Sequence, residues 1–280
     1  MYGLGYNVVS DDYKVVALSY YCYNQFRIAT CVDINSVRKG LWEKLENSPY
    51  DHSHTDSVSG VLVNGALHWL THRIPEYSSA IVGFNLSVDK FSEVPGPTDL
   101  QDYCFMCKLA ALKGYLCIST ILSPSMDKII FWIMKEYGVK ESWTKFEIKD
   151  PNLNVCLGKL LCSIGDDDDV LLDVNEELVI YNMTENWCKD LLLDVNHISY
   201  EGRTFVDSLV SPYFGRETEG YDVVSDDFKV VALSEGKSVT CVYIYSVRKG
   251  LWEKLENSPY DHSLSDHASG VLVNGALHWL

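Results

Sequence analysis

The sequence predicts an all-β protein of the β-propeller type, a kelch-like array of four-stranded antiparallel blades. Short runs rich in Val, Leu, Ile and aromatic residues recur along the chain and are separated by tight turns that contain glycine. An aromatic residue also recurs near the end of successive units, with spacings of 49, 52, 44 and 65 residues between Trp42, Phe91, Trp143, Trp187 and Trp252. All but the last spacing lie in or near the ~40–50 residues of a propeller blade.

The clearest single element is a hairpin over residues Ser59–Leu70. Apolar runs flank Asn64 and Gly65, the residue pair that a type I′ turn favours because both turn positions need a positive φ. Lys113 and Gly114 predict a similar turn. A unit with two such hairpins has four short strands, which we name a to d in chain order.

The predicted blades follow one another along the chain. They span Gly3–Leu45, Ser59–Val94, Met106–Ile148, Gly158–Leu193 and Gly220–Leu255, and Gly270–Leu280 provides two further strands. Sheets that are apolar on both faces must pack against similar sheets, and radial repetition achieves this. The recurring aromatic residues are expected to pack between neighbouring blades. A two-sheet sandwich is the alternative, but it does not predict the aromatic period.

The end of the chain repeats its beginning. Residues 36–53 recur unchanged as 246–263, and residues 59–70 recur unchanged as 269–280. We therefore divide the chain into residues 1–215 and a near-identical duplicate, residues 216–280, of residues 5–70. The duplicate is five residues shorter between the repeated segments. We expect it to pack as about one and a half further blades on the same propeller.

Composition excludes several classes of protein. The formal net charge of −16 disfavours nucleic-acid and anionic membrane partners and leaves a basic or neutral protein as the weak expectation. No apolar run approaches the ~20 residues of a membrane span. The N-terminal residues do not resemble a secretory signal. Nine cysteines, an odd number scattered along predicted strands, suggest buried thiols in the cytoplasm or nucleus.

No motif in the sequence predicts catalysis or a cofactor. The pair Cys104 and Cys107 has the spacing of half a zinc site, but no second close pair completes it. The histidines in Asp51–His54 lack a third ligand, and the acidic run Asp166–Asp169 lacks the glycine and glutamate of a calcium loop. We expect no metal, no cofactor and no enzymatic activity.

The predicted site is therefore a protein-binding surface. In a four-stranded blade the a–b and c–d turns emerge at one end, and they are short here, so that face should be smooth. The long b–c and d–a loops emerge at the other end, at Tyr20–Arg27, Thr71–Ser79, Gly96–Cys104 and Ser123–Asp127. Exposed Tyr and Arg residues on loops are typical of binding hot spots. The predicted partner-binding residues are Tyr20, Tyr21, Tyr23, Phe26, Arg27, His72, Arg73 and Tyr77.

Three stretches resemble the type 1 F-box-associated domain of plant F-box proteins, which has relatives in kelch-type and S-locus F-box proteins. They are Gly3–Val16, Val61–Trp69 and Trp132–Lys145, and Ser208–Pro212 is similar to the place where such domains close. The resemblance implies a β-propeller that here lacks the family's first blade. It also implies the substrate-recognition end of a cullin–RING ubiquitin ligase.

In that family an F-box grips a Skp-type adaptor while the propeller holds the target. The chain shows no F-box, so we expect a protein substrate as partner but no adaptor binding by this chain. Two alternatives remain at this stage: a carbohydrate-binding or hydrolytic propeller, and a non-functional fragment from a tandem duplication.

Overall fold

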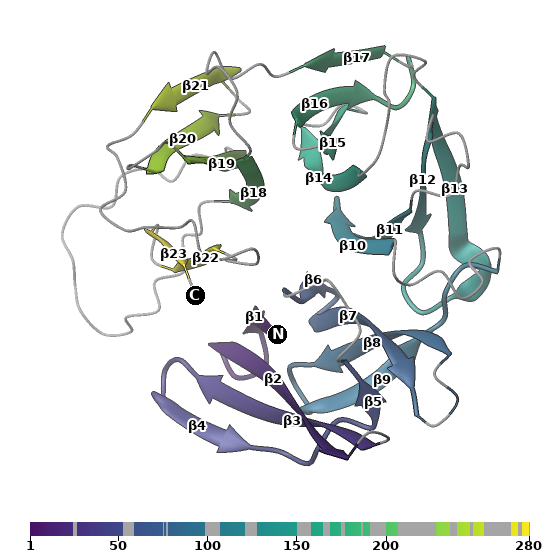
Figure 1. Cartoon of the computed structure of the whole chain (residues 1–280), viewed down its shortest axis with the longest axis vertical. Coiled ribbons are helices and arrows are strands. Elements are labelled where there is room, and N and C mark those ends of the chain that lie inside the picture. The colour runs from purple at the N-terminus through teal and green to yellow at the C-terminus, as the bar shows by residue number, and fades with distance from the viewer. Residues whose placement is uncertain are drawn as a thin grey trace. The chain divides into compact units, whose positions relative to one another are not determined.

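The described part of the chain consists of antiparallel sheets, each built mainly from strands consecutive in sequence (Figure 1). The computed structural model describes residues 1–24, 27–52, 59–74, 76, 78–98, 107–120, 128–149, 158–164, 169–174, 177–185, 187–190, 200–206, 228–235, 240–246, 249–254, 270–273 and 276–279. The strands divide between two compact units, the first formed by Met1–Leu122 with Ile130–Glu147 and the second by Ser123–Ile129 with Ile148–Leu280.

Sheets one to three lie in the first unit, apart from a few end residues of β12 and β13. Sheet one has the order β1-β2-β3-β4: β1 (Tyr2–Asn7), β2 (Asp12–Asn24), β3 (Arg27–Ser36) and β4 (Leu41–Lys44). Sheet two contains β5 (Tyr50–Asp51), β6 (Val61–Val63), β7 (Ala66–Arg73), β8 (Ser79–Asn85) and β9 (Lys90–Val94). Sheet three contains β10 (Cys107–Leu112), β11 (Tyr115–Thr120), β12 (Lys128–Met134) and β13 (Trp143–Lys149), and a short 3-10 helix, η2 (Lys140–Ser142), precedes its last strand.

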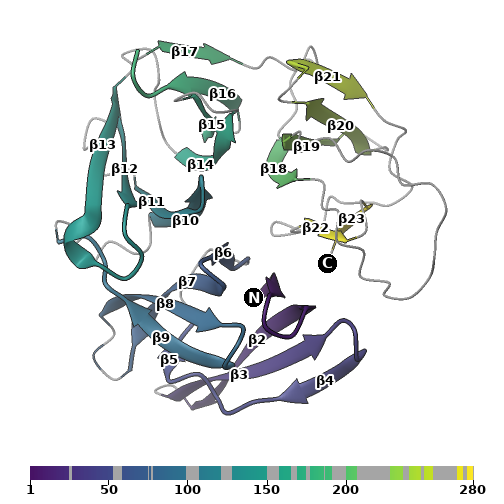
Figure 2. The same cartoon turned by 180° about the vertical axis from the view of Figure 1, so that it is seen from behind.

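The second unit holds two further four-stranded sheets and a hairpin. Sheet four runs β14 (Gly158–Ile164), β15 (Asp169–Val174), β16 (Glu177–Asn182) and β17 (Trp187–Asp190). Sheet five runs β18 (Tyr200–Val206), β19 (Phe228–Glu235), β20 (Thr240–Ser246) and β21 (Leu251–Lys254), and the hairpin pairs β22 (Gly270–Val273) with β23 (Ala276–Trp279). Figure 2 shows the same sheets from behind.

Local turn chemistry explains why the strands reverse where they do. Asn64 and Gly65 have φ values of 50° and 71°, and Lys113 and Gly114 have values of 48° and 78°. Both pairs thus have the positive φ values that the sequence predicted for a type I′ turn.

In sheet two, two short strands pair along the same edge of β7. β6 pairs with the start of β7, and β5 pairs with its last two residues.

Sheets one and two pack face to face through a continuous apolar core. Val16 and Ile34 of sheet one meet Trp69, Val82 and Phe84 of sheet two, all of them buried. The close approach depends on β1, which presents glycine to sheet two. A Cβ added at Gly3 would lie 2.8 Å from Leu67 Cδ1, and one added at Gly5 would lie 2.4 Å from Leu86 Cδ1. A side chain at either position would therefore separate the two sheets.

A second core joins sheets two and three through Leu70 and Ile81 on one side and Leu109, Leu116 and Ile118 on the other. The recurring aromatic residues contribute to these cores in part. Phe91 packs against the first core and Trp143 against the second, as expected. The expectation is wrong for Trp42, which is 58% exposed, because β4 lies at the edge of sheet one with all four residues exposed.

Predicted blades one, three and four agree with the sheets, but the second omits β5 of sheet two, and the fifth is wrong at its first strand. We expected that strand at Gly220 in the duplicated segment. In the structure β18, which precedes the duplicate, pairs with β19 in a continuous register from Tyr200↔Ser234 to Val206↔Phe228.

Among the described residues no helix is long and apolar enough to cross a membrane.

Candidate functional site

The predicted partner-binding residues gather in two places, and the first is a hairpin extension of sheet one. Beyond the last β1 partner of β2, at Ala17, the strands β2 and β3 continue to pair with each other. The pairing runs through Tyr20↔Thr30, Tyr21↔Ala29 and Cys22↔Ile28, with a bulge between Cys22 and Asn24. We name residues 19–31 the tyrosine arm.

The expectation of an irregular loop at Tyr20–Arg27 is therefore wrong, because most of this stretch continues the two strands. The side chains of Tyr20 and Tyr21 are 52% and 38% exposed. Tyr23 lies in β2 and Arg27 begins β3, whereas Phe26 lies outside the described residues. The stretch from Val16 to Ala29 contains a single charged residue, Arg27, so its sequence is aromatic and nearly uncharged in an acidic chain.

The second place is the connection between β7 and β8, where the expectation needs correction for His72. β7 extends to Arg73, and His72 is a buried strand residue whose backbone pairs with Asp51. A buried strand side chain cannot serve as an exposed loop contact. Tyr77 lies outside the described residues.

Arg73 is half-buried, and its guanidinium is engaged within sheet two. Nε and Nη2 donate to the carboxylate of Glu93, with Nη2 2.8 Å from Oε2, and Nη1 donates to the Ser79 carbonyl at 2.7 Å. Hydrogen bonding to Glu93 raises the pKa of Arg73. Burial, followed by the charge of Glu93, raises the pKa of Tyr50, the residue that pairs with Arg73 in the sheet. Arg73 thus stabilises the end of sheet two.

One pair of side chains has the residue types of a catalytic dyad, Ser48 and His52. Their Oγ and Nε2 atoms lie 3.0 Å apart, but both residues are buried, at 7% and 1% exposure. Burial lowers the pKa of His52 to about 4. A general base that works near neutral pH needs a pKa near 7 and access to its substrate. The environment of this pair therefore does not suit nucleophilic catalysis.

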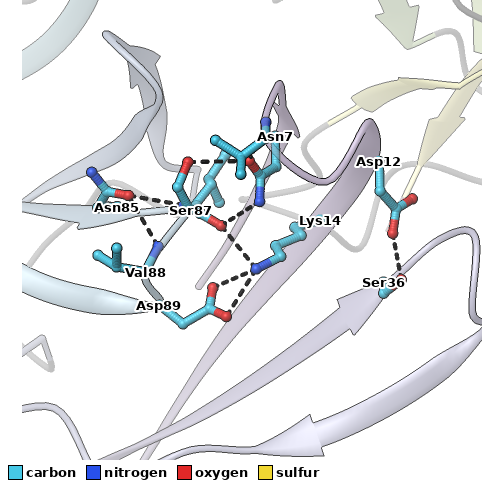
Figure 3. A network of polar contacts seen from close by, with 10 residues as sticks. Asn7, Asp12, Lys14, Ser36, Asn85, Ser87, Val88 and Asp89 are labelled. Carbon is cyan, nitrogen blue, oxygen red and sulfur yellow. Dashed lines mark hydrogen bonds and ion pairs between the residues drawn. The ribbon is translucent and has the colours of Figure 1, made fainter.

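A polar network that we did not predict joins sheets one and two at the opposite end of β2 from the arm (Figure 3). Asn7 donates from Nδ2 to the Leu86 carbonyl at 2.8 Å, and Lys14 donates to the same oxygen at 2.8 Å. Lys14 also forms an ion pair with Asp89 at 2.7 Å. A charged residue inside the alternating strand pattern around Lys14 is the sequence signal that could have indicated this contact.

A second such contact joins sheets two and three. The Nε2 atom of the buried His68 lies 2.7 Å from the hydroxyl of Tyr137, and its Nδ1 lies 3.0 Å from the Val61 carbonyl. Because a carbonyl can only accept, Nδ1 carries the proton, and Tyr137 donates to Nε2 of the neutral ring. Burial lowers the pKa of His68, which is consistent with a neutral imidazole.

No group of three or more His, Cys, Asp or Glu residues in the described part of the chain is arranged to hold a metal ion. Cys107 and Cys31 are buried. Cys104, His54 and Asp166, which we weighed as ligands, lie outside the described residues.

Consecutive four-stranded antiparallel sheets, packed face to face in the first unit, define a protein of the β-propeller class. The model of the F-box associated beta propeller domain matches residues 1–164. The chain belongs to this family.

Two similar proteins from Arabidopsis thaliana are F-box proteins by name. The F-box/kelch-repeat protein At3g23880 is 35% identical over 182 residues, which are 65% of this chain and 48% of that protein. F-box protein CPR1 is 29% identical over 231 residues, 75% of this chain and 55% of that protein. The chain thus spans about half the length of these curated relatives.

Among solved structures, an acylaminoacyl peptidase matches with a TM-score of 0.49 and 11% identity, covering 96% of this chain and 41% of that protein. An oligogalacturonate lyase matches with a TM-score of 0.46 and 11% identity, covering 93% and 73%. No conclusion about activity follows from likenesses at this level.

Proposed function

We propose that the chain is a non-catalytic, protein-binding propeller and forms the substrate-recognition part of an SCF-type ubiquitin ligase receptor. The observation that carries the proposal is the family match over residues 1–164, together with relatives that are F-box proteins by name. The adaptor contact then requires an F-box in addition to the residues of this domain. The target is a protein.

The tyrosine arm is the part of the proposed site that holds the target. Its support is chemical: Tyr20 and Tyr21 are large, exposed and amphipathic, and they project from a paired, register-fixed hairpin. Tyrosine on a rigid element loses little conformational entropy on binding and is enriched among hot spots. Arg73 and His72 support sheet two beneath its loops and are not part of the contact surface in this proposal.

The chain supplies a matched control for this proposal. In the duplicate, Glu235 and Thr240 occupy the register positions of Tyr20 and Thr30 and are joined by a connection five residues shorter. Replacing residues 20–29 by Glu-Gly-Lys-Ser-Val, the sequence of residues 235–239, removes the arm and keeps the pairing on either side.

The experiment fuses an F-box upstream of the full chain and compares ubiquitinated proteins in plant cells by ubiquitin-remnant mass spectrometry. We expect a small set of proteins whose modification requires both the F-box and the arm. An F-box variant that cannot bind the adaptor and the arm-replaced chain should both abolish the signal. If the arm-replaced chain modifies the same proteins to the same extent, the arm is not the target site.

A further inference from the structure

Six of the twelve exposed large hydrophobic residues described in the first unit lie at one end of its strands. This end carries the a–b and c–d turns of sheets one to three, at residues 8–11, 37–40, 64–65, 87–89, 113–114 and 135–142, which we name the turn face. The side chains that matter are Val8 and Val9, 81% and 79% exposed, Val88 at 61%, and Tyr115, Tyr137 and Val139 at 38–40%. The expectation of a smooth face described the short turns but missed these side chains.

Hydrogen bonds between neighbouring turns make the turn face one continuous, ordered surface. Asn7 and Lys14 reach across to the β8–β9 turn at Leu86 and Asp89 (Figure 3). Within sheet two the Leu86 N–H donates to the Gly65 carbonyl at 3.1 Å. Tyr137 of sheet three bonds His68 beside the β6–β7 turn.

The valines on this surface are not needed to form their turns. In the first turn the Asn7 side chain accepts from the Val9 N–H at 3.0 Å, and Asp11 adopts the positive φ of 50°. The second turn has the same construction, because Asn85 accepts from the Val88 N–H and Asp89 has a φ of 54°. Asn and Asp thus stabilise these turns, through a side-chain hydrogen bond and a positive φ, whereas β-branched residues are disfavoured in turns.

The charge of the turn face differs from that of the chain. The turn face contains five Lys or Arg residues against four Asp or Glu, and Lys14 and Lys90 lie beside it, although the whole chain has a net charge of −16. Two of the acidic residues are neutralised locally, Asp11 by Arg38 and Asp89 by Lys14. Lys39, Lys90 and Lys140 are exposed, and Lys135 lies over the ring of Tyr115 at 5.2 Å.

We propose that the turn face is a second docking surface, and that it binds a protein segment that is both apolar and acidic. Apolar side chains on a rigid support provide contact area, and the local excess of positive charge selects acidic partners in an otherwise acidic molecule. The surface lies at the opposite end of β2 from the tyrosine arm, so both can be occupied at once.

The test selects binders from a random 12-residue peptide library displayed on phage, with the full chain as bait. Enriched peptides should combine Asp or Glu with Leu, Ile or Phe. Their affinity, measured by fluorescence anisotropy, should fall at least tenfold in V8S/V9S/V88S and in K113E/K140E, and it should also fall with added salt. The arm-replaced chain should bind them within twofold of the original.

These measurements distinguish the two proposals, because replacing the tyrosine arm tests the proposed function and leaves the turn face intact. The valines are exposed, so V8S/V9S/V88S should keep the urea midpoint of the parent chain, which controls for folding. The proposal is overturned if the selected peptides are basic or uncharged, or if their binding is lost when the tyrosine arm is replaced. It is also overturned if the library yields no peptide whose binding depends on the turn face. Self-association that V8S/V9S/V88S abolishes would instead assign the surface to a second copy of the chain.

Discussion

The last three strands of sheet one and of sheet five have nearly the same sequence, yet the two sheets obtain their first strand from different places. β2 and β3 pair from Lys14↔Ser36 to Tyr20↔Thr30, and β19 and β20 pair at the equivalent positions from Lys229↔Ser246 to Glu235↔Thr240. Gly40 and Gly250 close the following turn with φ values of 65° and 64°. The strand pairing and the glycine turn thus recur with the repeated sequence.

The first strands differ in what they can pack against. β1 places Gly3 and Gly5 opposite Val16 and Lys14, and these glycines admit Leu67 and Leu86 of the next sheet. β18 places Arg203 and Phe205 opposite the equivalent residues Val231 and Lys229. β18 therefore has no glycine at either register position where β1 admits a leucine of the next sheet. In sheet one, strand a determines how closely the sheet meets sheet two.

The largest expected effect comes from the tryptophan that fills the core between sheets one and two. Trp69 is 0% exposed, so Trp69→Ala should reduce the free energy of unfolding by about 3–5 kcal/mol, as measured by urea denaturation. A loss below about 1 kcal/mol would contradict the placement of Trp69 in the core between sheets one and two.

The next effect concerns pH. His52 has its pKa lowered to about 4, so between pH 6.5 and 4 the unfolded chain binds a proton that the folded chain excludes. Stability should therefore fall as the pH falls through this window, by up to about 3 kcal/mol from this group. His52→Gln should flatten the pH dependence of the urea midpoint.

Burial is the main cause of this shift, and the ring of Phe91 lies 5.8 Å from that of His52. Parallel pH profiles for His52→Gln and the unchanged chain would show that His52 is not the titrating group.

Much of the fold could be predicted because the local sequence of a hairpin specifies its turn and its strands. Asn64 and Gly65 specify a turn, and apolar runs specify the strands on either side, so most strands of the first four sheets agree with expectation. The pairing of β5 with the end of β7 was not predicted. The choice of β18 could not be predicted, because β18 and β19 are separated by more than twenty residues and no tight turn in the sequence marks their pairing.

The candidate site was predictable in composition but not in geometry. The tyrosines of the arm stood out in the sequence, and Tyr20 and Tyr21 are indeed exposed. Nothing in the pattern showed that β2 continues to Asn24, or that β7 continues far enough to bury His72. Contacts such as Lys14 with Asp89 join residues far apart in sequence, and only the packed sheets bring them together.

An intermediate effect tests the glycine contact directly. Gly5→Val should lower stability by about 1–3 kcal/mol, because its Cβ alone would come within 2.4 Å of the fully buried Leu86. The equivalent change, Gly220→Val, should have little effect if β18 supplies the first strand of sheet five. Urea unfolding of both variants measures the difference, and a larger loss for Gly220→Val would assign that strand to the duplicate instead.

The smallest expected effect on stability belongs to the tyrosine arm. Replacing residues 20–29 by the five-residue sequence of 235–239 removes the pairs from Tyr21↔Ala29 to Asn24↔Arg27. The connection between the flanking paired residues shortens by five residues, and halving a loop recovers roughly 0.6 kcal/mol of closure entropy. Sheet five already shows that the shorter connection keeps the register.

We therefore expect the arm-replaced chain to unfold within about 1 kcal/mol of the original, as measured by urea denaturation with circular dichroism. Stability that survives while partner binding is lost would identify the arm as a functional addition to a sheet that folds without it. A loss greater than about 2 kcal/mol would mean that the arm supports the core, since surface changes rarely cost so much. Sheet one and sheet five would then differ in their folding requirements as well as in their surfaces.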